Sequence, residues 1–572
     1  MASLSFANWA EPHQIATNVS MMYDSFQMYR NTNRSKWEEL ESYLYATDTT
    51  SLKGSSSHDH TTHIPVLAEL KEELEAIMYA TVLPHEDFLS WVPFTQDSAA
   101  KVVRKKIMAF IKNRHSLNGF DKVFRKLIQD LVMYGNCFVK VNYVDERVNG
   151  IGYIGPKPIR LSPYDIVFDP TRADFDKTPK IVRAVMTMGE FISWTKTLPS
   201  VGQDLVERMK RRRQTVTSLS RTEINKANQY TPDGFNDIQA YCKSGVVEVL
   251  QFYGDVFDEE SFEVRPNRCA IVVDRVDLVT EYDEPTPNIF KAGWSDKPDN
   301  LWSQGPLDKV VGLNYQINHR ENSKSDALDR FIFPDKVFIG DVEEVYNEET
   351  GQTYYLAPEG GGVQDISPDT TVLTADMHQD KLMAYARAAA GLPPQLLGFR
   401  TPGEKTAFEV QNLDSAALRK FIHKAAQFEM DLLEPTVRAE ILIGRDNFHT
   451  VLQAISTDDE GIAIMLPVTR EDLSANGKLV PIGARRFSRQ NQQMRMINQL
   501  ANSNLGQLIG QHINSYNLAR VVEDLGGFSN YEFIDKFAAI VEAGEAQMQQ
   551  SMQEQELVSK LSNPGLDEIL VS

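Results

Sequence analysis

The pattern of apolar and polar positions is most informative between residues 301 and 443. A helix predicted at 306–330 has an apolar stripe in its first half only, formed by Leu307, Val310, Val311, Leu313 and Ile317. From 318 to 326 there is no large apolar residue. A helix that is polar on all sides is unstable alone, so we expect this half to bridge domains or to pack among copies of itself.

A small insertion and a second helix are predicted next. The insertion, 331–375, begins with a strand-like stretch at 331–340 and contains a second one, TYYLAP. Between these stretches the sequence predicts an acidic turn that holds Glu343, Glu344, Glu348 and Glu349. A helix at 375–391 follows and stops at a glycine and a pair of prolines.

The loop at 393–405 leads into a long helical pattern at 404–443, where apolar residues recur at steps of three and four. Pro435 should bend this helix near its end. Arg400 and Lys405 flank the loop tip and could contact DNA phosphate. The alternative is that these cations pair with a neighbouring carboxylate or a helix end.

The rest of the chain alternates between helical and strand patterns. Helices are predicted at 14–46, 65–82, 95–116 and 121–135, the last ending at Gly135, before a strand at 137–144. Further β-rich segments are 151–169, 180–189, 245–255, 268–281, 461–473 and 478–487. Helices rich in Gln, Asn and Met are predicted at 488–521 and 531–561, with disorder as the alternative for the last thirty residues.

The charge distribution limits the classes of partner. The formal net charge is −20, so we do not expect the chain to wrap DNA nonspecifically, although DNA could slide past an acidic wall. A basic cluster occurs in the charged helix-loop at 200–235 and comprises Arg208, Lys210, Arg211, Arg212 and Arg213. Contact with phosphate is one interpretation of this cluster, and a solvated helix face or a salt-bridged subunit contact is favoured.

No sequence motif for catalysis is present. The chain has no phosphate-binding P-loop, no HExxH metal-binding motif, no GxSxG nucleophile motif and no paired cysteines at zinc spacing. The histidines His58, His60 and His63, together with Asp59, could gather around a divalent metal, but a surface loop that happens to hold histidines is favoured. We therefore expect no catalytic residue, resident metal or cofactor, and no enzymatic activity.

Localisation signals are also absent. No apolar run is long enough to cross a bilayer, so no contact with a membrane is expected, and the N-terminus lacks the pattern of a secretory signal. The three cysteines, Cys137, Cys242 and Cys269, are widely separated and are expected to be buried free thiols in a reducing cytoplasm.

Three segments, together with the order of the predicted elements, resemble the portal (head–tail connector) proteins of tailed double-stranded DNA bacteriophages, most closely the short-tailed branch. LSPYDIVFDPT at 161–171 resembles a strand and turn of the portal wing. The segment 301–328 resembles the start of the first stem helix, and 390–411 resembles the second stem helix continuing into the tunnel loop and the long wing helix. The element order covers most of the chain, whereas the literal similarity is confined to these segments.

The resemblance implies an α+β fold, mainly helical, that assembles into a ring with an axial channel. The implied domains are a wing at 1–300 with 406–487, stem helices at 305–330 and 375–392, a clip at 331–374, a tunnel loop at 393–405 and a crown at 488–572. The ring, usually of twelve copies, would occupy one capsid vertex of the virion after assembly in the host bacterial cytoplasm. It would admit the genome during packaging, retain it and release it at infection.

The resemblance also implies partners and functional residues. The partners would be double-stranded DNA, the large terminase, a tail adaptor, the major capsid protein and the scaffold. The residues facing DNA would be Arg400, Thr401, Gly403 and Lys405 in the tunnel loop and His319, Arg320, Lys324 and Arg330 in the stem. Glu343, Glu344, Glu348 and Glu349 would dock a partner at the clip. Two alternatives stay open: another ring-shaped virion protein, such as a tail adaptor or an internal core protein, and a metal-dependent nuclease that uses the histidine loop.

Overall fold

The fold is described from a computed structural model of the whole chain. It describes residues 9–481 except 10, 47–59, 61, 84–87, 95–97, 148–151, 197, 199–200, 202–203, 216–244, 259–261, 285, 333–334, 341–342, 348–351, 357–361, 367–375, 393–419, 449–451 and 458–462. The described residues are mixed α and β, and about half of them are helical. The expected combination of α and β structure is therefore confirmed, with helix as about half of the described residues. Within this part of the chain no helix is both long enough and apolar enough to cross a membrane.

The predicted helices of the N-terminal part are confirmed. They are α1 (Pro12–Leu44), α2 (Val66–Val82), α3 (Ser98–Asn118) and α4 (Phe120–Tyr134). Gly135 ends α4 in the left-handed conformation, with φ 69°, as its sequence position predicted. A Cβ atom at Gly135 would lie 2.3 Å from the backbone nitrogen of Gly305, so only glycine permits this close approach.

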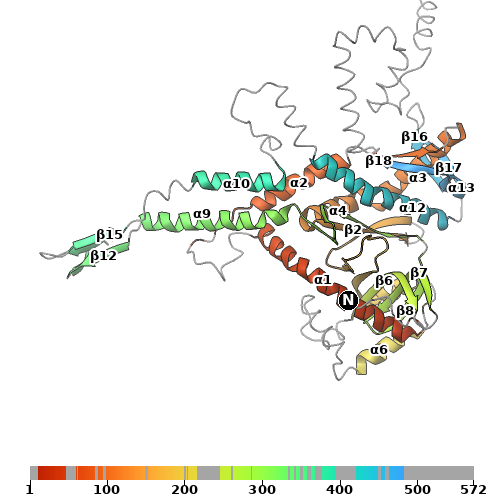
Figure 1. Cartoon of the computed structure of the whole chain (residues 1–572), viewed down its shortest axis with the longest axis horizontal. Helices are drawn as coiled ribbons and strands as arrows, with labels where there is room; N and C mark the ends of the chain where they lie inside the picture. The colour runs from red at the N-terminus through yellow and green to blue at the C-terminus, as the bar shows by residue number, and fades with distance from the viewer. Residues whose placement is uncertain are drawn as a thin grey trace, which may run out of the picture.

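Two antiparallel sheets form the β part of the body. The strand β2 (Asn136–Asp145) lies between β3 (Ile154–Leu161) and β9 (Ile289–Gly293). The larger sheet has the order β4 (Ile166–Phe168), β5 (Lys180–Thr187), β6 (Val246–Asp258), β7 (Glu263–Val273) and β8 (Asp277–Asp283). Helix α1 packs on one face of this sheet, where Phe26 contributes to a core with Leu250 and Phe252 (Figure 1).

Shorter elements complete the body. The strand pairs are β1 (Leu89–Pro93) with β18 (Gly477–Pro481), β10 (Ser295–Lys297) with β11 (Asn300–Gln304), and β16 (Leu452–Thr457) with β17 (Ala463–Val468). The remaining short helices are α5 (Met188–Thr195), α6 (Leu205–Thr215) and α13 (Arg470–Leu473). The strand predicted at 461–473 ends at Val468, and its last part forms α13 instead. The helix begins there because Thr469 caps its N-terminus and accepts a hydrogen bond from Asp472 N.

A helical arm projects from this body. It consists of α9 (Val311–Ile332), preceded by a 3₁₀ turn at Leu307–Lys309, and of α10 (Asp376–Ala390), which lies beside α9 (Figure 1). Two small sheets follow α9 in the sequence: β12 (Asp335–Ile339) pairs with β15 (Gly362–Ile366), and β13 (Glu343–Asn347) pairs with β14 (Gln352–Leu356). The β12–β15 pair lies at the far end of the arm (Figure 1).

Two predictions within these segments need correction, and a third is not tested. Phe331 and Ile332 belong to the last turn of α9, not to a strand. Glu343 and Glu344 lie in β13, where they pair with Leu356 and Tyr355, and not in a turn. Glu348 and Glu349 lie outside the described residues.

The long helix is described from residue 420 to Asp446, so the part at 404–419 lies outside the described residues. Instead of a simple bend it has a π-helical turn at Glu429–Leu433, directly before α12 (Glu434–Asp446). Pro435 has no N–H to continue the α-helical pattern, and its ring would clash with the carbonyl four residues earlier. The wider turn, in which Glu434 N bonds to Glu429 O, accommodates the proline.

Candidate functional site: the arm and the charged clusters of the body

The polar half of α9 binds an extended segment of the same chain. We call residues 60 and 62–65 the strap; they lead directly into α2. Asn318 Oδ1 accepts a hydrogen bond from Ile64 N at 3.0 Å, and Asn322 Oδ1 accepts one from Thr62 N at 2.8 Å. Asp326 Oδ1 accepts from His60 N at 3.0 Å. We call these three side chains the acceptor row.

The spacing of the two partners explains this match. Side chains four residues apart on a helix rise by about 6 Å, and alternate residues of an extended chain are about 6.6 Å apart. Every second backbone N–H of the strap therefore meets every fourth side chain of α9. Shifting the strap by one residue so that residue 65 lies opposite Asn318 would bring Pro65, which has no N–H, into the row. The proline thus excludes this register.

Histidine side chains add contacts at both ends of the strap. His60 Nε2 lies 2.6 Å from Asp329 Oδ2, and His63 Nδ1 lies 3.0 Å from Asn318 Nδ2. These two members of the predicted histidine loop are therefore engaged with α9, while His58 and Asp59 lie outside the described residues. No group of three metal-ligating side chains occurs in the described part of the chain.

The predicted stem residues all lie on α9 but do not converge on one point. His319 is exposed and its ring stacks on Tyr315, with 6.1 Å between centroids. Lys324 lies 3.9 Å from Glu321 across one helical turn, Arg330 is exposed near the end of α9, and Arg320 is half-buried. Of the clip residues, Glu343 and Glu344 are exposed. The tunnel-loop residues Arg400, Thr401, Gly403 and Lys405 and the segment 488–572 lie outside the described residues.

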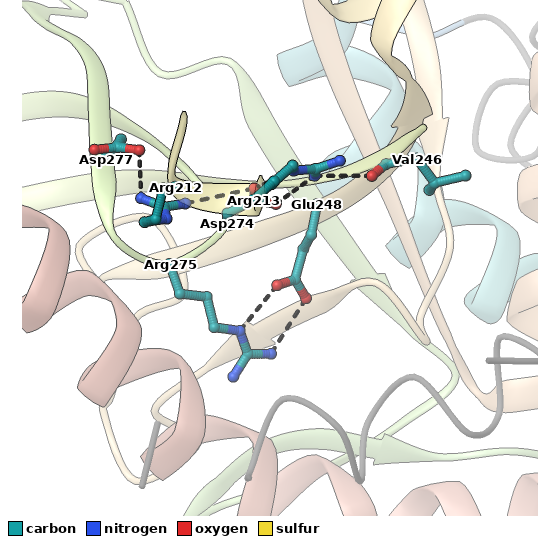
Figure 2. Close-up of polar contacts among 7 residues, drawn as sticks. All are labelled: Arg212, Arg213, Val246, Glu248, Asp274, Arg275 and Asp277. Carbon is teal, nitrogen blue, oxygen red and sulfur yellow. Dashed lines mark hydrogen bonds and ion pairs between the residues drawn. The ribbon is translucent and has the colours of Figure 1, made fainter. Parts of the chain in front are cut away.

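The basic cluster on α6 is bound within its own chain. Arg213 Nε and Nη2 each lie 2.9 Å from a carboxylate oxygen of Asp274, and Nη2 also donates to Val246 O at 2.9 Å (Figure 2). Arg212 pairs with Asp277 and with Asp274. Arg211, by contrast, makes an exposed pair with Glu207. These contacts dock α6 on the turn between β7 and β8, so Arg212 and Arg213 are engaged within the chain. Arg208, Lys210 and Arg211 are exposed, as expected for a solvated helix face.

The same turn holds a second, buried ion pair. Arg275 Nε donates to Glu248 Oε2 at 2.9 Å and Nη2 donates to Oε1 at 3.2 Å, and both side chains are 0% exposed (Figure 2). Arg275 also binds Asp24 of α1 at 2.9 Å and lies over the ring of Tyr23. Asp274 and Arg275 both have positive φ, 50° and 61°. The turn therefore directs Asp274 to α6 and Arg275 to α1, and it fixes both helices on the sheet.

A buried lysine connects the two large sheets. Lys140 on β2 donates to Gln251 Oε1 at 2.9 Å and to the hydroxyl of Tyr253, both on β6. Burial lowers the pKa of Lys140 to about 8, and the charges of Cys269 and Glu284 partly oppose this shift. Burial also raises the pKa of Cys269 to about 11. Cys137 and Cys269 are buried free thiols, as predicted, and Cys242 lies outside the described residues.

No model of a known protein family matches the chain, and no curated protein matches it either.

Proposed function

We propose that the chain is the portal protein of a tailed bacteriophage, a subunit of a ring whose axial channel carries the genome through one capsid vertex. The observation that supports this most is the arm: two adjacent helices leave a mixed α and β body and lead to small sheets at the far end (Figure 1). The arm coincides with the segments whose sequence resembles a portal stem and clip. In this proposal the body is the wing, 393–405 is the tunnel loop and 488–572 is the crown.

The end of the arm supports assembly with other chains. Phe331 and Ile332 are 51% and 64% exposed, and Val337 and Ile339 of β12 are 40% and 52% exposed. Adjacent apolar side chains of this kind mark a surface that another protein covers. An isolated two-stranded sheet is also only marginally stable in water. Neighbouring copies in a ring would supply both the apolar cover and additional strands.

Charge is consistent with a passive channel. The net charge of −20 disfavours a tight sheath of phosphate contacts, which would arrest a moving duplex. The chain contains no ATP-binding motif, so the motor activity would belong to a partner, the large terminase. The exposed Glu343 and Glu344 of β13 would contribute to docking the terminase and later the tail adaptor. The major capsid protein and the scaffold would surround the wing.

The proposal predicts that the purified chain forms closed rings. Negative-stain images should show broad wings above a narrow stem, and mass measurement should give one closed assembly, twelve copies being the expectation. A ring without a narrow stem would favour another virion protein, such as a tail adaptor. A single chain that stays monomeric at every concentration, in the virion and in solution, would contradict the proposal.

The tunnel loop provides a second prediction. Replacing Arg400 and Lys405 by glutamine should leave ring assembly unchanged and reduce the amount of DNA that filled heads retain, because phosphate contacts would be lost. The matched control replaces Arg147 and Lys177, two exposed cations of the body, and should leave both properties unchanged. Packaged DNA is measured per head after nuclease treatment. If both variants retain equal amounts of DNA, Arg400 and Lys405 do not contact DNA in the channel.

A further inference from the structure

The acceptor row on α9 has a fourth member that the strap does not reach. Asn314 lies four residues before Asn318, continues the same row and is 0% exposed. Among the residues that the structure describes, neither Nδ2 nor Oδ1 of Asn314 has a hydrogen-bond partner. A buried amide without partners is costly, so its presence in this row needs an explanation.

The strap turns away one residue before it would reach Asn314. By the alternation of the strap, the next N–H in the series belongs to Val66. Val66 N instead bonds to Ile64 O at 2.9 Å, across Pro65 with φ −81° and ψ 49°. These values are those of an inverse γ-turn, a local and easily reversed bend. Changing ψ of Pro65 to an extended value would redirect Val66 N along the row.

We propose that the base of the arm has a second state, in which Val66 N–H binds Asn314 and α2 gives up its first residue to the strap. The observed state keeps the γ-turn and leaves Asn314 without a partner; the second state exchanges the γ-turn bond for a bond between the strap and α9. Because α2 contacts both α4 and α9, the exchange changes how the arm is attached to the body. A partner that binds the two states with different affinities would shift the balance between them. This inference does not depend on the proposed function.

The test is methyl relaxation dispersion of the full-length chain, which detects sparsely populated states that exchange in microseconds to milliseconds. The methyl groups of Val66 and Ile64 should show dispersion in the wild type. Asn314→Leu removes the acceptor and should abolish it. Pro65→Ala weakens the γ-turn and should increase the population of the second state. Ile317→Val, which trims a buried neighbour on α9 without removing a polar group, is the matched control and should leave the dispersion unchanged.

Dispersion that is absent in the wild type, or that persists in Asn314→Leu, would overturn the proposal and leave Asn314 as a buried amide in a single state. If Asn314→Leu does not fold, Val66→Pro serves the same purpose. Proline is tolerated at the first position of a helix and has no N–H, so the second state cannot form. Because this variant lacks the Val66 methyl groups, the Ile64 methyl group is the remaining probe. Persistence of its dispersion in this variant counts equally against the proposal.

Discussion

Replacing Arg275 by methionine is expected to lower the free energy of unfolding by about 3–5 kcal/mol, the usual effect of removing one partner of a buried ion pair. The variant retains most of the apolar stem of the side chain but leaves Glu248 Oε2 without the guanidinium that contacts it at 2.9 Å. Arg183 still lies 2.8 Å from Oε1, so the carboxylate keeps one cation on its other oxygen. The contact between Arg275 and Asp24 of α1 is lost as well.

The measurement is the denaturant midpoint of the unfolding transition, with α1 and the large sheet observed by hydrogen exchange. Arg211→Met is the matched control, because it removes the same charge from α6 at an exposed pair with Glu207 and should change stability by only about 0.5 kcal/mol. Adding Glu248→Leu to Arg275→Met should recover part of the loss, since the buried carboxylate is removed. The recovery is only partial because Arg183 then loses its 2.8 Å contact with that carboxylate. If Arg275→Met and Arg211→Met have equal stability, the buried pair does not hold α1 on the sheet.

Local signals made the body largely predictable. The end of α4 at Gly135 followed from one glycine, and β2 followed from alternating apolar residues, because both depend on neighbours in the sequence. The same local signals gave a wrong prediction for the acidic stretch. Glu343 and Glu344 suggested a turn, whereas pairing with β14 outweighs their low strand propensity. The π-helical turn before Pro435 is a structural response to the proline that the apolar pattern does not encode.

The candidate sites were less predictable because they join residues far apart in the chain. The sequence showed that the second half of α9 is polar, but the strap that satisfies it lies more than 250 residues away in the sequence. The arginines of α6 were visible as a cluster, whereas their partners Asp274 and Asp277 had no distinguishing signal. Lys140 lies within the predicted strand at 137–144, where nothing in the sequence indicated that its amine is buried.

That buried lysine gives a prediction of opposite sign to the first. The pKa of Lys140 is about 8 in the folded chain, below its ordinary value of 10.5. At pH 7 the amine is protonated in both states, and the folded state bears the full cost of burying the charge, about 3 kcal/mol. Between about pH 8 and 10.5 the folded chain releases this proton before the unfolded chain does, so the contribution to stability rises with pH and the cost disappears.

Lys140→Met is therefore expected to raise the free energy of unfolding at pH 7 by about 1–2 kcal/mol, because the removed desolvation cost exceeds the two lost hydrogen bonds to Gln251 and Tyr253. The difference between variant and wild type should shrink as the pH rises and should reverse once the wild-type amine is neutral in both states. Denaturant titrations of both proteins at a series of pH values measure this difference directly, and the titrations of groups far from Lys140 cancel because they are common to both chains. Lys177→Met, at a side chain that is 83% exposed, is the control for removing a lysine and should leave the free energy of unfolding at pH 7 nearly unchanged. A variant that is less stable than the wild type at pH 7 would show that the bonds made by the amine outweigh its burial.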